Sequence, residues 1–181
     1  MVSKVTFQID EKGFLKDHKQ ILSPNSSARD PNQKIELIVI HAISLPPNKF
    51  GGHFVEQLFT NQLDVSADPY FETIQDLKVS SHFYIDRHGE IIQFVSCLDK
   101  AWHAGESYWN GRNNCNDFTL GIELEGSDDT SFTEIQYSKL NLLIACLSDR
   151  FPIKDIVGHK DIAPNRKTDP GPFFDWSKIK K

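Results

Sequence analysis

The chain has 181 residues, of which 39% are hydrophobic and 25% charged, and its formal net charge is −5. This length fits one domain with a full hydrophobic core rather than two domains. The acidic balance argues against broad electrostatic binding to nucleic acid, and no apolar run approaches the roughly 20 residues that a membrane span needs.

The first 33 residues are expected to form an N-terminal extension that leads into the core, with a turn-rich loop over Ser23–Asn32. The opening eight residues alternate polar and apolar side chains and lack the apolar block of a secretory signal. The three cysteines (Cys97, Cys115 and Cys146) form neither a C-x-x-C pair nor an obvious disulfide framework. We therefore expect buried thiols in a reducing cytoplasm.

A strand is predicted over Ile35–Ile40, because its central residues are apolar on both faces. Two short helices are expected after Gly51-Gly52, the second with Asp68 as N-cap followed by a proline. A hairpin is predicted next, with strands at 81–85 and 91–95 joined by a turn.

A further strand is expected over Phe118–Glu125, where Glu123 and Glu125 share one face. The strongest helix pattern begins at Glu134 and ends near Asp149, with a capping box before it and one apolar stripe along it. Strands interleaved with helices predict an α/β fold, a mixed β-sheet flanked by helices in a single domain covering residues 1–181.

Two of the seven histidines, His41 and His159, follow predicted strands. The segment after His159 adds two carboxylates, Asp161 and Asp169, and the amine of Lys167. Two imidazoles and one carboxylate would leave the fourth position of a zinc ion open, which is the layout of a catalytic site. The alternative is that each histidine is a hydrogen-bonded edge residue, because the spacing alone is not a ligand signature. Which aspartate would act as ligand stays open on this argument.

Glu123 lies inside an apolar strand, where an unpaired charge would be costly. It is either salt-bridged or a general base with a raised pKa. Glu125 is its competitor on the same face, but the polar residues after it place it nearer to solvent. The pattern favours Glu123.

Trp102 and His103 stand among small residues and could line a sugar or peptide groove, although a tryptophan is more often part of the core. The polar and aromatic loop Tyr108–Asn114 is consistent with a groove wall and equally with an ordinary surface loop.

Several segments, in order from His41 to Trp176, carry a resemblance to a known family. They are Ile40-His41, Ile43–Pro47, Phe50–Gly52, Ala101–Gly105, Cys115–Phe118, Gly121–Gly126, Gly158-His159, Ile162–Pro164 and Arg166–Pro172. Together they resemble the AmpD family, cytosolic zinc N-acetylmuramoyl-L-alanine amidases that recycle 1,6-anhydro-muropeptides. The resemblance implies the single-domain fold shared by these amidases and the peptidoglycan-recognition proteins.

Residue by residue, the resemblance implies a zinc ion on His41, His159 and Asp169, and catalytic roles for Glu123 and Lys167. It thereby selects Asp169 over the other aspartate of its segment. The implied reaction is hydrolysis of the amide bond between (1,6-anhydro-)N-acetylmuramic acid and L-alanine.

The chain departs from the family at three positions of the expected substrate site. In well-known members an asparagine follows the first ligand, where this chain has Ala42. Lys78 and Asn114 stand where arginines contact the substrate. We expect these positions, with Trp102 and His103, to contact substrate, and we expect stem-peptide contacts to differ from those of the family.

The expected partner is a small muropeptide, with no nucleic acid, no membrane and no obligate protein partner. Two other functions are possible for such a chain. A peptidoglycan-binding module of the same fold would lack catalysis, although such modules lose a zinc ligand and all three positions are filled here. A cysteine hydrolase using Cys115 or Cys97 would need an electropositive site around a low-pKa thiolate, which the sequence near Cys97 does not indicate.

Overall fold

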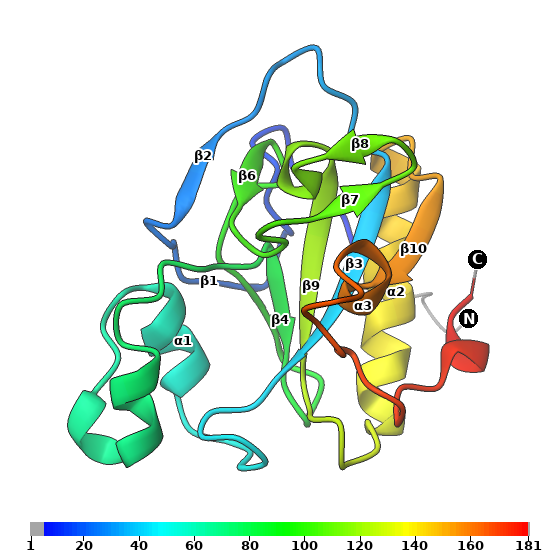
Figure 1. Ribbon diagram of the computed structural model, residues 1–181. Coiled ribbons are helices and arrows are strands. Elements are labelled where there is room, and N and C mark those ends of the chain that lie inside the picture. Colours follow the sequence, from blue (N-terminus) through cyan, green and yellow to red (C-terminus); the bar gives the residue numbers. More distant parts are fainter. Residues whose placement is uncertain (1–5, 181) are drawn as a thin grey trace.

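The computed structural model describes residues 6–180 (Figure 1). Residues 1–5, on which part of the expectation about a secretory signal rests, lie outside the described residues, as does residue 181. The main sheet is mixed, in the order β1-β5-β4-β9-β3-β10, which confirms the predicted fold class. Its strands are β1 (Lys19–Gln20), β3 (Leu37–Ile43), β4 (Phe83–Ile85), β5 (Ile91–Gln93), β9 (Thr119–Glu125) and β10 (Asp155–Gly158).

Helix α2 (Glu134–Arg150) covers one face of the sheet, as the sequence predicts. The hydroxyl of Thr133 accepts a hydrogen bond from the Gln136 amide, and the Gln136 side chain accepts one from the Thr133 amide, which completes the predicted capping box. Its apolar stripe packs on β3 and β9 in the largest core cluster. The members of that stripe are Tyr137, Leu140, Leu143, Ile144 and Leu147.

Shorter elements surround the opposite face. They are α1 (Phe54–Phe59), α3 (His159–Ile162), the pair β2 (Ser26–Ala28) and β6 (Asp99–Ala101), the pair β7 (Tyr108–Trp109) and β8 (Arg112–Asn113), and 3-10 helices at Val65–Ala67, Pro69–Thr73, Cys115–Asp117 and Trp176–Lys178. All three cysteines are free and buried, as expected. Within the described residues, no helix has both the length and the apolarity to cross a membrane.

Three local predictions need correction. The expected loop over Ser23–Asn32 contains β2, and β1 joins the edge of the main sheet, because both segments pair with strands distant in sequence. The helix capped by Asp68 is a 3-10 helix, with the Asp68 carboxylate accepting from the Tyr70 amide. Strand β3 continues to Ile43, beyond the predicted end.

The longer β3 places His41 inside a strand instead of after it. Parallel pairing with β9 runs to the end of β3 and sets His41 opposite Glu123. Because side chains alternate along a strand, His41 shares the face of Leu37 and Val39, which pack away from α2. Ile38 and Ile40 face the α2 core. The candidate site therefore lies on the face opposite α2.

A candidate metal centre

His41, His159 and Asp169 converge on one point. His41 lies on β3, and His159 is the first residue of α3, directly after the neighbouring parallel strand β10. The Nδ1 atoms of the two histidines are 3.0 Å apart, and Oδ2 of Asp169 lies 3.1 Å from Nδ1 of His41 and 3.2 Å from Nδ1 of His159. Among the described residues, this is the one group of three such side chains close enough to hold a metal ion.

This geometry fits a small tetrahedral cation. Zinc binds imidazole nitrogen and carboxylate oxygen at about 2.0–2.2 Å, so neighbouring ligand atoms of a tetrahedron lie about 3.3 Å apart. The three observed separations are 3.0, 3.1 and 3.2 Å. Three protein ligands leave the fourth position of a tetrahedron for water or substrate.

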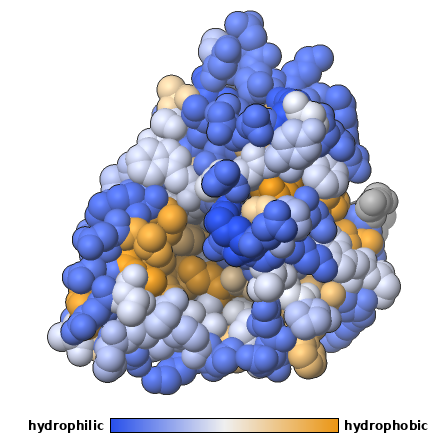
Figure 2. All heavy atoms as spheres, viewed as in Figure 1, coloured by the Kyte–Doolittle hydropathy of each residue, from blue (hydrophilic) through white to orange (hydrophobic). Residues whose placement is uncertain are grey.

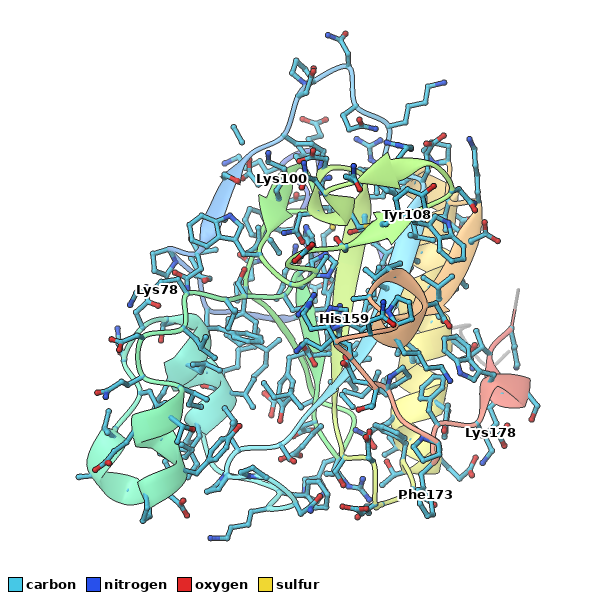
Figure 3. The ribbon with its side chains drawn as sticks, in the orientation of Figure 1. Lys78, Lys100, Tyr108, His159, Phe173 and Lys178 are labelled. Carbon is cyan, nitrogen blue, oxygen red and sulfur yellow. The ribbon has the colours of Figure 1, made fainter. Side chains whose placement is uncertain are left out.

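The hydrogen bond made by Nε2 of His159, the ring nitrogen that faces away from the cluster, determines the tautomer of this histidine. Its Nε2 atom lies 3.1 Å from the carbonyl oxygen of Ala104, which can only accept, so Nε2 carries the proton. The lone pair is then on Nδ1, which faces the centre. Figure 3 shows His159 at the start of α3, in front of the central strands. The Nε2 atom of His41 lies 2.9 Å from Nδ1 of His103.

Burial and hydrogen bonding set the charges that a metal requires. Burial lowers the pKa of His41 to about 4, so its ring is neutral at neutral pH. Burial also lowers the pKa of His103 well below its ordinary value. For Asp169, burial alone would raise the pKa, but the close contacts of its carboxylate with the rings of His159 and His41 outweigh burial and hold the pKa below its usual range. The site therefore offers the neutral imidazole of His41 and the ionised carboxylate of Asp169.

Glu123 places an unpartnered carboxylate beside this cluster. Its Oε1 atom is 4.0 Å from Nδ1 of His41, and its Oε2 atom is buried without a hydrogen-bond partner. Burial raises the pKa of Glu123 well above its ordinary value, the charge of Asp169 adds to this, and the Lys167 ammonium opposes it.

Glu125 differs from the sequence expectation, which placed it near solvent. Only 4% of it is exposed. Its carboxylate accepts hydrogen bonds from the amides of Gly51 and Arg87, because those loops fold over the end of β9. Since Glu125 is fully engaged, Glu123 is the carboxylate available for chemistry.

The cluster opens into a cavity of about 480 Å³. Ala42, Trp102, His103 and Lys167 all line it. Trp102 is about one-third exposed, so it is a wall of the cavity and not part of the core. An apolar wall faces the cluster, and Figure 2 shows hydrophobic atoms gathered in a hollow beside the hydrophilic centre of this face. Residues of that wall include Leu58, Phe59, Ile74, Leu77 and Val79.

Two expected substrate residues lie outside the lining of this cavity. Lys78 is exposed at its edge, between Leu77 and Val79, which do line it (Figure 3). Asn114 is exposed and lines a separate depression, of which Trp102 is also a lining residue. Both residues are near the site, but the structure does not bring them to the metal cluster.

Other residues of the site gave no sequence signal of their role. The Arg166 guanidinium donates hydrogen bonds to the carbonyls of Ala104 (2.6 Å) and Glu106 (2.9 Å), which ties the loop carrying Lys167 and Asp169 to the opposite wall. Asp161, the other aspartate that the sequence offered as a ligand, is not a member of the cluster, and its carboxylate accepts from the Gly158 amide at 2.7 Å at the start of α3.

Known proteins share this architecture. A family model described as N-acetylmuramoyl-L-alanine amidase matches residues 31–172. The 1,6-anhydro-N-acetylmuramyl-L-alanine amidase AmpD of Haemophilus influenzae is 50% identical over 93% of each chain. The crystal structure of a selenomethionine derivative of AmpD is 46% identical, covers 93% of this chain and 96% of its own, and has a TM-score of 0.91.

A more distant solved structure holds a ligand. It is AmiD of E. coli in complex with the substrate anhydro-N-acetylmuramic acid-L-Ala-D-gamma-Glu-L-Lys. It is 28% identical, covers 94% of this chain and 63% of its own, and has a TM-score of 0.58.

Proposed function

Because this chain belongs to the N-acetylmuramoyl-L-alanine amidase family, we infer that it hydrolyses the amide bond between 1,6-anhydro-N-acetylmuramic acid and L-alanine of muropeptides in cell-wall recycling. The observation that carries this inference is the cluster of His41, His159 and Asp169, open to a cavity and flanked by the unpartnered carboxylate of Glu123. An anhydromuramyl peptide is the ligand of the related AmiD structure.

The metal that these ligands fit is zinc, since two imidazole nitrogens and one carboxylate oxygen form a common catalytic zinc set. Such an ion would supply a water that ionises near neutral pH and would polarise the scissile carbonyl. The neutral ring of His41 and the ionised carboxylate of Asp169 support this assignment.

In this proposal Glu123 acts as the general base and then as the general acid. Its raised pKa suits a group that accepts a proton from the attacking water and returns it to the nitrogen of the leaving L-alanine. Lys167 lines the same cavity, which supports assigning to its ammonium the stabilisation of the negative charge that develops on the carbonyl oxygen.

Substrate contacts are assigned to the walls of the cavity. Trp102 presents a partly exposed ring, and Ala42 borders the metal cluster on β3. Lys78 and Asn114 are assigned to the periphery, where they would meet the stem peptide rather than the scissile bond. A cytoplasmic location is part of the proposal, and cell fractionation would check it.

Mass spectrometry of products from a purified anhydro-muropeptide tests the reaction. We expect the anhydro-sugar and the free peptide, loss of turnover with a strong chelator, and recovery with zinc. The variant Glu123→Gln should bind zinc but lose most turnover. Binding without hydrolysis in the zinc-loaded wild type would instead indicate a recognition module.

Treatment with a thiol alkylator distinguishes the proposed metal enzyme from a cysteine hydrolase. The three thiols are buried, and burial raises the pKa of Cys97 and of Cys115. We expect no inhibition of the folded enzyme. Rapid inactivation by alkylation with zinc retained would contradict the metal mechanism.

A further inference from the structure

We propose that His103 and Ala104, held in place by the side chain of Asn116, form one positioning unit that orients both histidine ligands of the metal centre. This inference rests on the proposed zinc site and concerns residues that act through the ligands. His103 is thereby a positioning residue and not a contact of the substrate.

Consecutive residues supply the outer hydrogen-bond partners of the two ligands. Nδ1 of His103 lies 2.9 Å from Nε2 of His41, and the carbonyl oxygen of Ala104 lies 3.1 Å from Nε2 of His159. Outer partners of this kind fix the tautomer and ring orientation of a metal-binding histidine. Two consecutive residues, one through its ring and the other through its carbonyl oxygen, therefore orient two ligands that are 118 residues apart in the sequence.

Asn116 holds the backbone of these two residues. Its Oδ1 atom accepts hydrogen bonds from the amides of both His103 (3.2 Å) and Ala104 (2.9 Å). Trp102, the preceding residue, is held by Ser80, whose hydroxyl accepts from the Trp102 amide at 3.0 Å. Because one side-chain oxygen serves both amides, a change at Asn116 should move the partners of both ligands together.

Metal binding by His41 would determine which atom donates in the hydrogen bonds that join His41, His103 and Thr119. If the Nδ1 lone pair of His41 is to hold a metal ion, Nε2 of His41 would carry the proton and Nδ1 of His103 would accept the hydrogen bond. His103 then has its own proton on Nε2, which lies 3.0 Å from the hydroxyl oxygen of Thr119. Both ring nitrogens of His103 are engaged by protein atoms, so neither is free to bind substrate.

Paired variants test the unit. His103→Leu removes the acceptor, whereas His103→Asn keeps an oxygen near the position of Nδ1. Asn116→Leu removes the acceptor for the two amides, whereas Asn116→Asp keeps it. Zinc dissociation constants are measured by chelator competition, with kcat and KM at saturating zinc and the melting temperature of the metal-free protein as further readouts.

We expect each leucine variant to weaken zinc binding by about 10- to 100-fold, and the polar partner variants to recover most of that loss. KM should change little. Equal zinc affinity in His103→Leu and wild type would overturn the proposal, as would a rise in KM alone, which would make His103 a substrate contact. Equal losses in all four variants, with matching falls in melting temperature, would show a merely structural role and would also overturn it.

Nitrogen-15 NMR of the zinc-loaded wild type tests the same proposal without any substitution. We expect the proton of His103 on Nε2, and a proton on Nδ1 would overturn the proposed direction of the chain. Wild type that binds zinc but does not cleave muropeptides would contradict the proposed reaction alone. Wild type that binds no zinc would overturn both proposals.

Discussion

The ring of His103 occupies the space where a side chain on Gly121 would begin. A Cβ atom built on residue 121 would lie 2.5 Å from Cγ of His103, closer than real Cβ contacts. Glycine inside a strand commonly marks such a close approach of another group. The strand β9 therefore carries Glu123 to the metal cluster and, two residues earlier, leaves room for the partner of His41.

Gly121→Ala should force His103 away from His41. Overpacking of this kind costs about 1–3 kcal/mol of unfolding free energy, which denaturant titration would measure. The double variant Gly121→Ala with His103→Ala is the control, because removing the ring should relieve most of the cost. If the double variant lost as much unfolding free energy as the two single variants together, the result would contradict the contact between residue 121 and the ring of His103.

Asp169→Ala should weaken zinc binding by more than about 100-fold, because loss of a ligand exceeds the usual effect of losing an outer partner. Metal analysis after equilibration with buffered zinc would measure this. Asp161→Ala is the matched control, since that carboxylate caps α3 and should cost about 1 kcal/mol of stability without releasing the metal. Stoichiometric zinc in Asp169→Ala would rule out the ligand assignment.

The unfolding free energy of the metal-free protein should fall as the pH rises, because Glu123 is then forced to ionise in the folded state. The pKa of Glu123 is raised above the ordinary value of 4.5, so the folded state keeps a proton that the unfolded chain has released. The resulting contribution is fully present below that ordinary value and falls as the pH rises through the raised pKa. Urea unfolding of metal-free wild type and Glu123→Gln, at pH values from about 4 to 8, would show the variant gaining relative stability with pH. A difference between the two proteins that stays constant over this range would contradict the shift.

Lys167→Ala should lower kcat by very roughly 10²-fold, the usual effect of removing one donor to a developing oxyanion. Steady-state kinetics on the anhydro-muropeptide would measure it. The exposed Lys160, which lies on α3, provides the control, and Lys160→Ala should retain full activity. A change in KM alone would assign Lys167 to substrate binding.

Thr133→Ala should lower the unfolding free energy by about 1 kcal/mol, because the hydroxyl that caps α2 is lost. Thr133→Ser keeps the hydroxyl and should remain close to wild type. Both variants should keep full activity, since α2 lies on the face opposite the site. Thermal or urea unfolding would check the stability difference.

Local patterns in the sequence predicted several elements well. The capping residues and apolar stripe of α2 depend on neighbours within a few positions, and the structure confirms them. The alternation along β9 placed Glu123 and Glu125 on one face for the same reason. Two histidines after apolar strands indicated a metal site, and resemblance to a family selected Asp169 as the third ligand.

Tertiary structure decided what depends on distant pairing. The end of β3, the strand β2 and the burial of Glu125 follow from contacts with segments that are remote in the sequence. The sequence by itself determined the residue types of the site and the local elements that carry them. Only the folded chain brought the ring nitrogens of His41 and His159 within 3.0 Å, because two parallel strands far apart in sequence lie side by side in the sheet. It also placed His103 behind the first ligand, since that contact requires the space left by a glycine on a third strand.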